Sequence, residues 1–134
     1  MSRPLAREAA MQLLFEQLFG GEGEADTLVD LIGYTPDAID AAYIHEVVTG
    51  VLAHEAVLDQ KIATRLRGWT LDRISKVDHA ILRLAVFEME HMHLPAGVAI
   101  NEAIELTRKF SGESSCAFVN GVLGAIHRAA ESEE

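Results

Sequence analysis

The sequence predicts an all-α fold, and three observations lead to this prediction. Apolar residues recur three and four positions apart through most of the chain, as the buried face of a helix requires. Residues typical of helix starts and stops flank these segments. No convincing alternation of polar and apolar residues, which would indicate a strand, is found. With 134 residues, the chain fits a single domain.

The first helix is expected from about Arg3 to Phe19. Ser2 can cap its start and Pro4 suits a first helical turn, because neither position needs an intrahelical N–H donor. An acidic, glycine-rich loop should follow over Gly20 to Asp26. A short helix is then expected around Thr27 to Ile32.

Apolar periodicity from Ile39 to Leu66 predicts either one long helix or two consecutive helices. Gly68 and Trp69 interrupt the pattern. Ser75 followed by Asp78 resembles a capping box, which would begin the next helix. That helix should bury Val77, Ile81, Leu84 and Ala85.

Pro95 should end this helical region, because proline cannot continue a helix. The last two helices are expected over Val98 to Phe110 and Ser115 to Ala130, separated at Ser111 and Gly112. The acidic tail after Ala130 should fray.

Charge is distributed unevenly along the chain. The net charge of -10 disfavours a strongly basic nucleic-acid binder. However, Glu8 to Gln60 contains eleven acidic residues and no Lys or Arg, whereas Lys61 to Arg83 contains six basic residues and two acidic ones. The simplest interpretation is two solvated faces, but the asymmetry also allows separate acidic and basic binding surfaces.

The candidate catalytic and metal-binding groups lack the necessary spacing. His91 and His93 are two positions apart and would point in different directions from a helix, and the same holds for Glu88 and Glu90. Cys116 is the only cysteine, so it cannot form an internal disulfide, and a packing role is the most probable one. We therefore predict no catalytic residue, no metal and no cofactor.

The first ten residues carry charged side chains instead of the long apolar run of a secretion signal. No stretch approaches the ~20 apolar residues of a membrane span. We therefore expect a cytoplasmic protein without membrane association.

Proteins hold single-stranded RNA with cations and aromatic rings, and two clusters in the sequence contain such residues. Arg3 and Arg7 lie four positions apart on the predicted first helix, and Phe110 follows Arg108 and Lys109 before a Ser-Gly turn. Helix solubility and core packing are the plainer explanations. Phe110, which precedes a turn, is the better candidate for an exposed ring.

Five segments, in order, resemble characteristic blocks of the NusB family of transcription antitermination factors. They cover almost the whole chain and read AREAAMQLLFE (6–16), YIHEVVTGVLAHEAVLD (43–59), WTLDRISKVDHAILRLAVFEM (69–89), PAGVAINEAIELTRKFSGESS (95–115) and FVNGVLGAI (118–126).

The resemblance implies a NusB-like fold of two small helical bundles packed into one domain, about 1–67 and about 68–130. It also implies antitermination, especially in ribosomal RNA operons. The implied partners are boxA-type single-stranded RNA, the ribosomal protein NusE and the RNA polymerase antitermination complex. We further expect Trp69 and Ile74 to seal the junction between the two bundles.

Carried over by position, the resemblance assigns RNA binding to Arg3, Arg7, Arg108, Lys109, Phe110, Phe118 and Asn120. It assigns partner binding to Phe15, Asp78 and Arg83. The sequence departs from the family's arginine-rich N-terminal motif, because Pro4 and Leu5 stand where many relatives carry arginine. This departure predicts low RNA affinity of the isolated protein.

Two alternatives remain open. The depleted arginine motif and the net charge also suit a NusB relative that binds protein only. A NusB-like domain of an RNA cytosine methyltransferase is the other alternative, but it would require an additional α/β region with a glycine-rich cofactor loop, and none follows Ala130.

Overall fold

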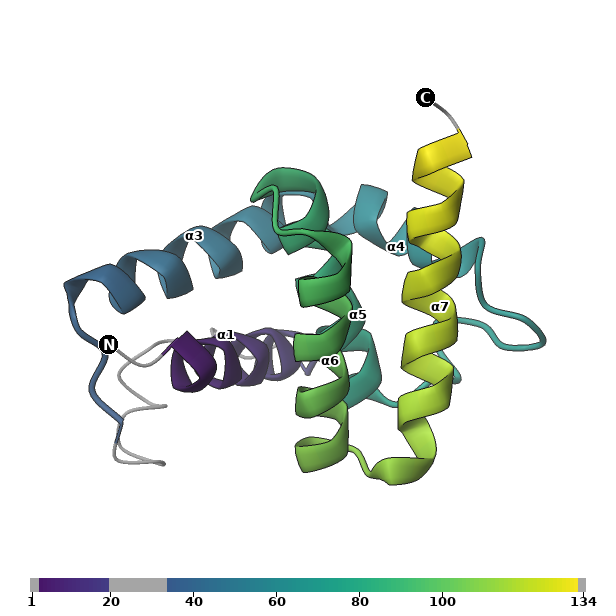
Figure 1. Ribbon diagram of the computed structural model, residues 1–134. Coiled ribbons are helices and arrows are strands. Elements are labelled where there is room, and N and C mark those ends of the chain that lie inside the picture. The colour runs from purple at the N-terminus through teal and green to yellow at the C-terminus, as the bar shows by residue number, and fades with distance from the viewer. Residues whose placement is uncertain (1–2, 20–33, 133–134) are drawn as a thin grey trace.

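The computed structural model describes residues 3–19 and 34–132, which form six α-helices and contain no strand (Figure 1). The helices are α1 (Arg3–Gln17), α3 (Ala38–Ala53), α4 (Glu55–Ala63), α5 (Lys76–His91), α6 (Ala96–Phe110) and α7 (Glu113–Ser132). The predicted all-α class is confirmed. The loop expected over Gly20 to Asp26 and the helix expected around Thr27 to Ile32 lie outside the described residues. In the described ranges, no helix combines the length and the apolarity needed to cross a membrane.

Two helices occupy the long periodic segment for which the sequence allowed either one or two. The break falls at His54, whose backbone N–H donates back to the carbonyl oxygens of Gly50 and Val51. The start of α5 is capped as predicted, because the Ser75 hydroxyl oxygen accepts a 3.0 Å hydrogen bond from the N–H of Asp78.

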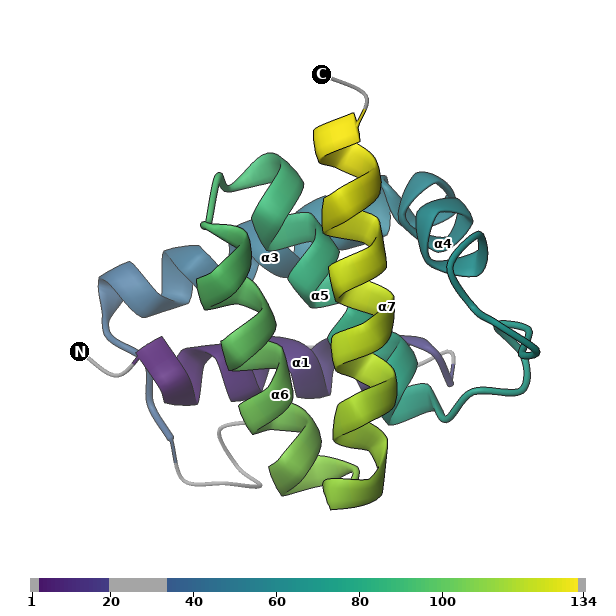
Figure 2. The same cartoon turned by 45° about the vertical axis from the view of Figure 1, so that its right-hand side comes forward.

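Helix α5 lies at the centre of the molecule and contacts each of the other five described helices (Figures 1 and 2). All its residues from Asp78 to Glu88 are buried. A helix enclosed on every side is apolar around most of its circumference, and its few polar residues need partners. The buried apolar residues form one core cluster that includes members of all six helices. The division into two bundles near residue 67 stays a prediction.

The packing of α3 on α5 depends on a glycine. A Cβ atom added to Gly50 would lie 2.2 Å from Cζ of Phe87, which is buried. Only glycine therefore lets the two helix backbones approach this closely.

The prediction that Trp69 seals an internal junction is wrong. Gly68 has a φ of 77°, a left-handed conformation that glycine adopts easily, and Trp69 follows it with 54% of its surface exposed. The segment between α4 and α5 projects as a loop on one side of the molecule (Figure 2). Ile74, the other residue that was predicted to seal this junction, is half-buried and packs against the core. The interruption of the apolar periodicity identified a loop, but it did not indicate whether the indole in that loop would be buried or exposed.

Candidate nucleic-acid and partner interfaces

Most of the predicted RNA-binding residues gather where α1 meets α6, a surface that we call the α1–α6 face. The two helices are joined by ion pairs from Lys109 to Glu8 (2.7 Å) and from Arg7 to Glu102 (3.3 Å). A hollow of about 430 Å³ between them is lined by Pro4, Arg7, Glu8, Glu102, Glu105, Leu106, Arg108 and Lys109. The face thus combines Arg7 with the Arg-Lys-Phe segment of residues 108–110, about a hundred residues later in the sequence.

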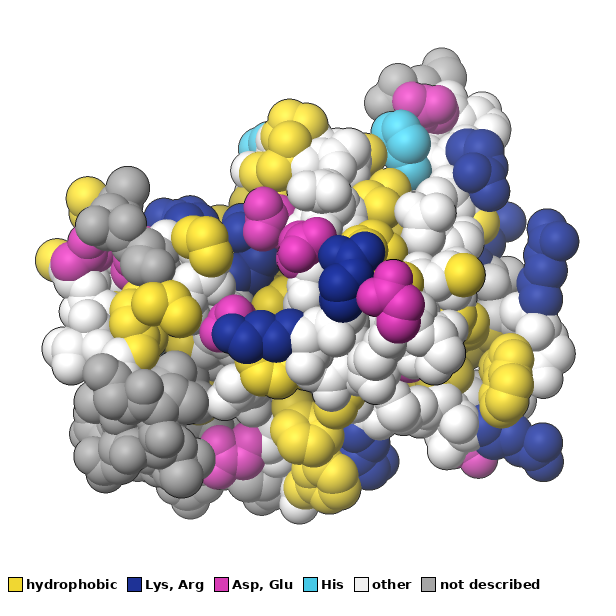
Figure 3. All heavy atoms as spheres, turned by 60° about the horizontal axis from the view of Figure 1, so that its bottom comes forward, with side chains coloured by type: hydrophobic (Ala, Val, Ile, Leu, Met, Phe, Trp, Pro, Cys, Tyr) yellow, Lys and Arg dark blue, Asp and Glu magenta, His cyan; other side chains and the backbone are white. Residues whose placement is uncertain are grey.

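The exposed cations of the α1–α6 face are already neutralised by carboxylates. Arg108 lies 2.7 Å from Glu105 and 2.9 Å from Glu113, and Lys109 lies 2.7 Å from Glu8. Dark blue and magenta side chains accordingly lie side by side near the centre of Figure 3. A phosphate would therefore compete with these carboxylates for the two cations.

Arg7 is buried rather than presented to solvent. Its guanidinium donates to both carboxylate oxygens of Glu88 on α5, over 3.0 and 2.9 Å, and only 6% of the residue is exposed. Burial alone would lower the pKa of Arg7, but the hydrogen bonds that it donates to Glu88 and the neighbouring negative charge raise it above its ordinary value. Arg7 therefore stays charged and links α1 to the central helix.

Arg3 and Phe110 are more accessible. The Arg3 guanidinium lies over the Tyr43 ring, 4.2 Å from its centroid, and its Nε donates to Asp40 over 3.3 Å. Phe110 is half-buried and packs against the core with one side, while the Lys109 amino group lies 5.4 Å from its ring centroid. Of the predicted aromatic residues, Phe110 alone stands at the α1–α6 face.

Phe118 lies at a second location, a hollow of about 350 Å³ between α7 and the segment that follows α4. Its lining residues are Arg65, Arg67, Trp69, Ala117, Phe118, Gly121, Val122, Ala125 and Arg128. We call this the linker–α7 hollow. Asn120 is exposed two residues further along α7, which at ~100° per residue places it on the opposite side of the helix.

Sequence reasoning did not select the three arginines and the tryptophan of this hollow as site residues. The excess of positive charge between Lys61 and Arg83 was the available signal. Its assignment to a site required the fold, because Arg128 and Phe118 come from α7, about fifty residues later in the chain.

Two of the three predicted partner-binding residues, Phe15 and Asp78, lie near the junction of α1 and α5. Phe15 is half-buried on α1 and makes an edge-on contact with Phe19, at 5.0 Å between ring centroids. Phe19 is 64% exposed, and the amino group of Lys76 at the start of α5 lies 5.4 Å from its ring. An exposed ring of this size beside a cation suits a protein contact.

Asp78, in the first turn of α5, is 6% exposed, and its Oδ1 atom has no hydrogen-bond partner among the residues that the structure describes. A buried carboxylate oxygen without a donor is unfavourable, so such atoms usually acquire a partner from another molecule or from water. Asp78 is therefore suited to accept a hydrogen bond from a bound protein.

Arg83 is turned inward, where it fastens α4 to α5. Its guanidinium donates to Asp59 over 2.9 and 2.6 Å, and His79 Nε2 lies 2.8 Å from the same carboxylate. Burial alone would raise the pKa of Asp59, but the hydrogen bonds from His79 and Arg83 outweigh it and lower the pKa to about 2. Within residues 3–19 and 34–132, no group of three His, Cys, Asp or Glu side chains could hold a metal ion.

Comparison with known proteins identifies the class. The chain is 44% identical over 130 residues to the transcription antitermination protein NusB of Clostridium botulinum, covering 94% of this chain and 98% of the relative. It also resembles the solved structure of Thermotoga maritima NusB, with a TM-score of 0.83, 29% identity and coverage of 96% and 92% of the two chains. These relatives, together with the all-helical fold, define a transcription antitermination protein.

A family model described as the NusB family matches residues 4–128. The chain belongs to the NusB family. A further structural match is a crystal structure of the antitermination factors NusB and NusE in complex with double-stranded RNA, with a TM-score of 0.82 and 27% identity. That match covers 96% of this chain and 99% of the other.

Proposed function

We propose that this chain is an RNA-binding adaptor that binds boxA-type single-stranded RNA together with the ribosomal protein NusE and brings both to RNA polymerase in the cytoplasm. The observation that supports this most is the match, over 96% of the chain, to a NusB protein whose structure includes NusE and RNA. An adaptor needs only modest contacts to each component, because tethering raises the effective concentration of the others.

The RNA-contacting set comprises Arg3, Arg108, Lys109, Phe110, Phe118 and Asn120. Each is at least partly accessible, and the ion pairs of Arg108 and Lys109 lie at the surface. Breaking an exposed ion pair costs only ~0–1 kcal/mol, so a phosphate can replace the carboxylate. Arg7 has a different role, because its buried pair with Glu88 holds α1 in place beneath the face instead of contacting RNA.

NusE would bind at the junction of α1 and α5. Phe15 and the exposed ring of Phe19 supply apolar area, and Asp78 Oδ1 accepts a hydrogen bond from the partner. Arg83 contributes indirectly, because its ion pair with Asp59 fixes α4 against α5.

Electrostatics explains why the complex, and not the isolated chain, should be the RNA-binding species. The chain carries a net charge of -10, and the exposed cations of its α1–α6 face are paired. A basic ribosomal partner would offset the acidic charge and add its own cations along the RNA. Linkage then requires RNA to tighten the protein pair by the same factor as the partner tightens RNA binding.

The direct test is a fluorescence-anisotropy titration of labelled boxA-type RNA with the chain alone and with the chain plus NusE. A scrambled RNA of equal length is the control. We expect weak binding to the chain alone and at least tenfold tighter binding in the presence of NusE. Equal affinity for both RNAs, or an affinity for boxA-type RNA that NusE does not increase, would contradict the proposal.

The neutralised cations also favour a second candidate function, that of a family member that binds NusE without contacting RNA. Calorimetric titration of NusE separates the surfaces: Phe19→Ala and Asp78→Lys should each weaken NusE binding at least fivefold. Asp78→Asn, which keeps an acceptor oxygen, is the matched variant and should bind nearly as the parent does. If NusE binds the chain normally but neither the chain nor its complex with NusE binds RNA, the protein-only function is correct.

A further inference from the structure

The linker–α7 hollow lies apart from the α1–α6 face and differs from it in charge. Arg65 and Arg67 approach it from the segment after α4, and Arg128 approaches from α7. No carboxylate lines the hollow, and none of these three arginines forms an ion pair within the described part of the chain. In contrast, Arg108 and Lys109 are both paired. Although the chain has a net charge of -10, no carboxylate of the described residues pairs with any of these three arginines.

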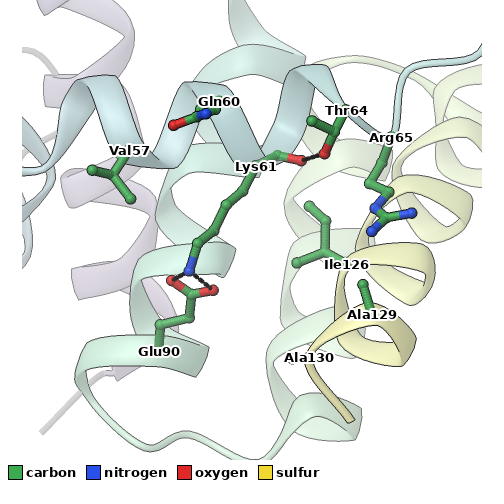
Figure 4. Close-up of a pocket in the computed structure, with 9 residues that line it drawn as sticks. All are labelled: Val57, Gln60, Lys61, Thr64, Arg65, Glu90, Ile126, Ala129 and Ala130. Atoms are coloured by element: carbon green, nitrogen blue, oxygen red, sulfur yellow. Dashed lines mark hydrogen bonds and ion pairs between the residues drawn. The ribbon is translucent and has the colours of Figure 1, made fainter. Parts of the chain in front are cut away.

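Figure 4 shows this contrast between Lys61 in α4 and Arg65 in the turn that follows the helix. Lys61 extends from α4 to Glu90 and is neutralised there, whereas Arg65, one turn later, extends toward α7 beside Ile126 and Ala129. A second hollow of about 340 Å³ occupies this space between α4 and α7. Arg65 lines both hollows, so they are neighbours along α7, and the linker–α7 hollow, which holds the three arginines, is the one that we call the groove.

Aromatic rings accompany the cations. Trp69 is 54% exposed at the rim of the linker–α7 hollow, and Phe118 is half-buried in its wall. Exposing so much of an indole forfeits the free energy that its burial would contribute. Ala125, which is half-buried, adds apolar surface to the lining. The groove therefore offers flat apolar surfaces next to positive charge.

We infer that this groove binds single-stranded RNA, with phosphates contacted by Arg65, Arg67 and Arg128 and bases stacked on Trp69 and Phe118. Positive charge that follows a backbone, together with rings on which bases stack, is the physical basis of single-strand binding. An acidic peptide would be held by the arginines but would gain little from an exposed indole. A duplex keeps its bases stacked internally and could not present them to the rings.

This inference rests on the proposed function and extends its RNA surface. Arg108, at the end of α6, pairs with Glu113 in the first turn of α7, and Phe118 lies five residues further along α7. At 1.5 Å per residue this separation is about 7.5 Å along the helix axis. One RNA strand that contacts Phe110 at the α1–α6 face can thus continue past the start of α7 into the groove.

The test measures the affinity of boxA-type RNA of about 12 nucleotides for the chain plus NusE, by anisotropy at several salt concentrations. The variant Arg65→Gln/Arg67→Gln should bind at least tenfold more weakly, and the magnitude of its salt slope should fall by about 1.4, since each single-strand phosphate contact contributes ~0.7. Arg73→Gln is the matched control: Arg73 lies exposed in the same loop and forms no ion pair with any described residue, but it does not line the hollow. It should change affinity less than twofold.

Stacking is tested at Trp69. Trp69→Ala should weaken RNA binding roughly 5- to 150-fold with little change in salt slope, and Trp69→Phe should recover most of the loss. Because Trp69 is exposed, both variants should melt within a few degrees of the parent. It is the only tryptophan in the chain, so quenching of its fluorescence by the RNA at low salt reports stacking without any substitution.

The results separate this inference from the proposed function. If the parent with NusE binds no RNA, both fail. If Phe110→Ala weakens binding but the Arg65/Arg67 and Trp69 variants bind as the parent does, only the groove is refuted. Displacement of the RNA by polyglutamate or by duplex RNA as effectively as by unlabelled single strand would also refute it.

Discussion

Replacing Arg7 by methionine removes a buried cation while keeping a side chain of similar length. The Glu88 carboxylate, 3% exposed, would then lose its two hydrogen bonds of 3.0 and 2.9 Å from Arg7. Removing one member of a buried ion pair typically costs ~3–5 kcal/mol, because the other charge remains buried without compensation. For a domain of this size, each kcal/mol lowers the melting temperature by roughly 3–6 °C. We therefore expect a decrease of about 10–30 °C.

Differential scanning calorimetry measures this decrease, and Arg3→Met provides the control on the same helix. The side chain of Arg3 is 37% exposed, and its partner Asp40 keeps a hydrogen bond from the Tyr34 hydroxyl, so the loss of Arg3 should cost less stability than the loss of Arg7. The double variant Arg7→Met/Glu88→Leu should recover most of the stability, because no unpaired charge remains. An Arg7→Met variant that melts at the same temperature as the parent would contradict a stabilising role of the buried pair. If the same variant also showed a salt slope of RNA binding reduced by the contribution of one phosphate contact, Arg7 would be a phosphate ligand.

Three further predictions concern the surface, the acid range and the core. Glu113→Gln should leave Arg108 paired with Glu105 alone and raise RNA affinity about 2- to 5-fold at low salt, and an unchanged affinity in anisotropy titrations would show that the pair with Glu113 does not compete with phosphate. The pKa of Asp59, about 2 in the fold against an ordinary 3.8, gives a stabilisation that is complete above about pH 4 and is lost as the pH falls toward 2. Urea denaturation should show this loss as about 1–2 kcal/mol in the parent and not in Asp59→Asn. Gly50→Ala should destabilise the fold by ~1–3 kcal/mol, because its Cβ would meet the Phe87 ring at 2.2 Å, and Phe87→Leu in the same chain should restore part of that stability.

The sequence predicted helices well because their determinants are local. The periodic spacing of apolar residues indicated each described helix, and the Ser75 cap marked the start of α5 within one residue. The two-residue extension of α7 before Ser115, in contrast, has no strong capping signal. Local patterns thus predicted which elements form, with boundaries less certain where no cap is present.

The candidate site was less predictable because its properties depend on contacts between distant residues. Nothing near Arg7 in the sequence reveals Glu88, which lies 81 positions away and buries the guanidinium. Equally, Lys109 is neutralised by Glu8 across 101 positions. Charge counts along the sequence therefore identified the cations, but the fold alone separates those that are paired from those that are free.

The proposed role in transcription is tested most directly by terminator readthrough in an extract of the source bacterium from which the chain has been depleted. The template carries a boxA-type element upstream of a terminator, and a second template carries a scrambled element. Adding back the purified chain should restore readthrough on the first template only, and Asp78→Lys should restore much less than the parent. Equal readthrough on both templates, or full activity without NusE binding, would contradict an adaptor that joins this RNA to its protein partner.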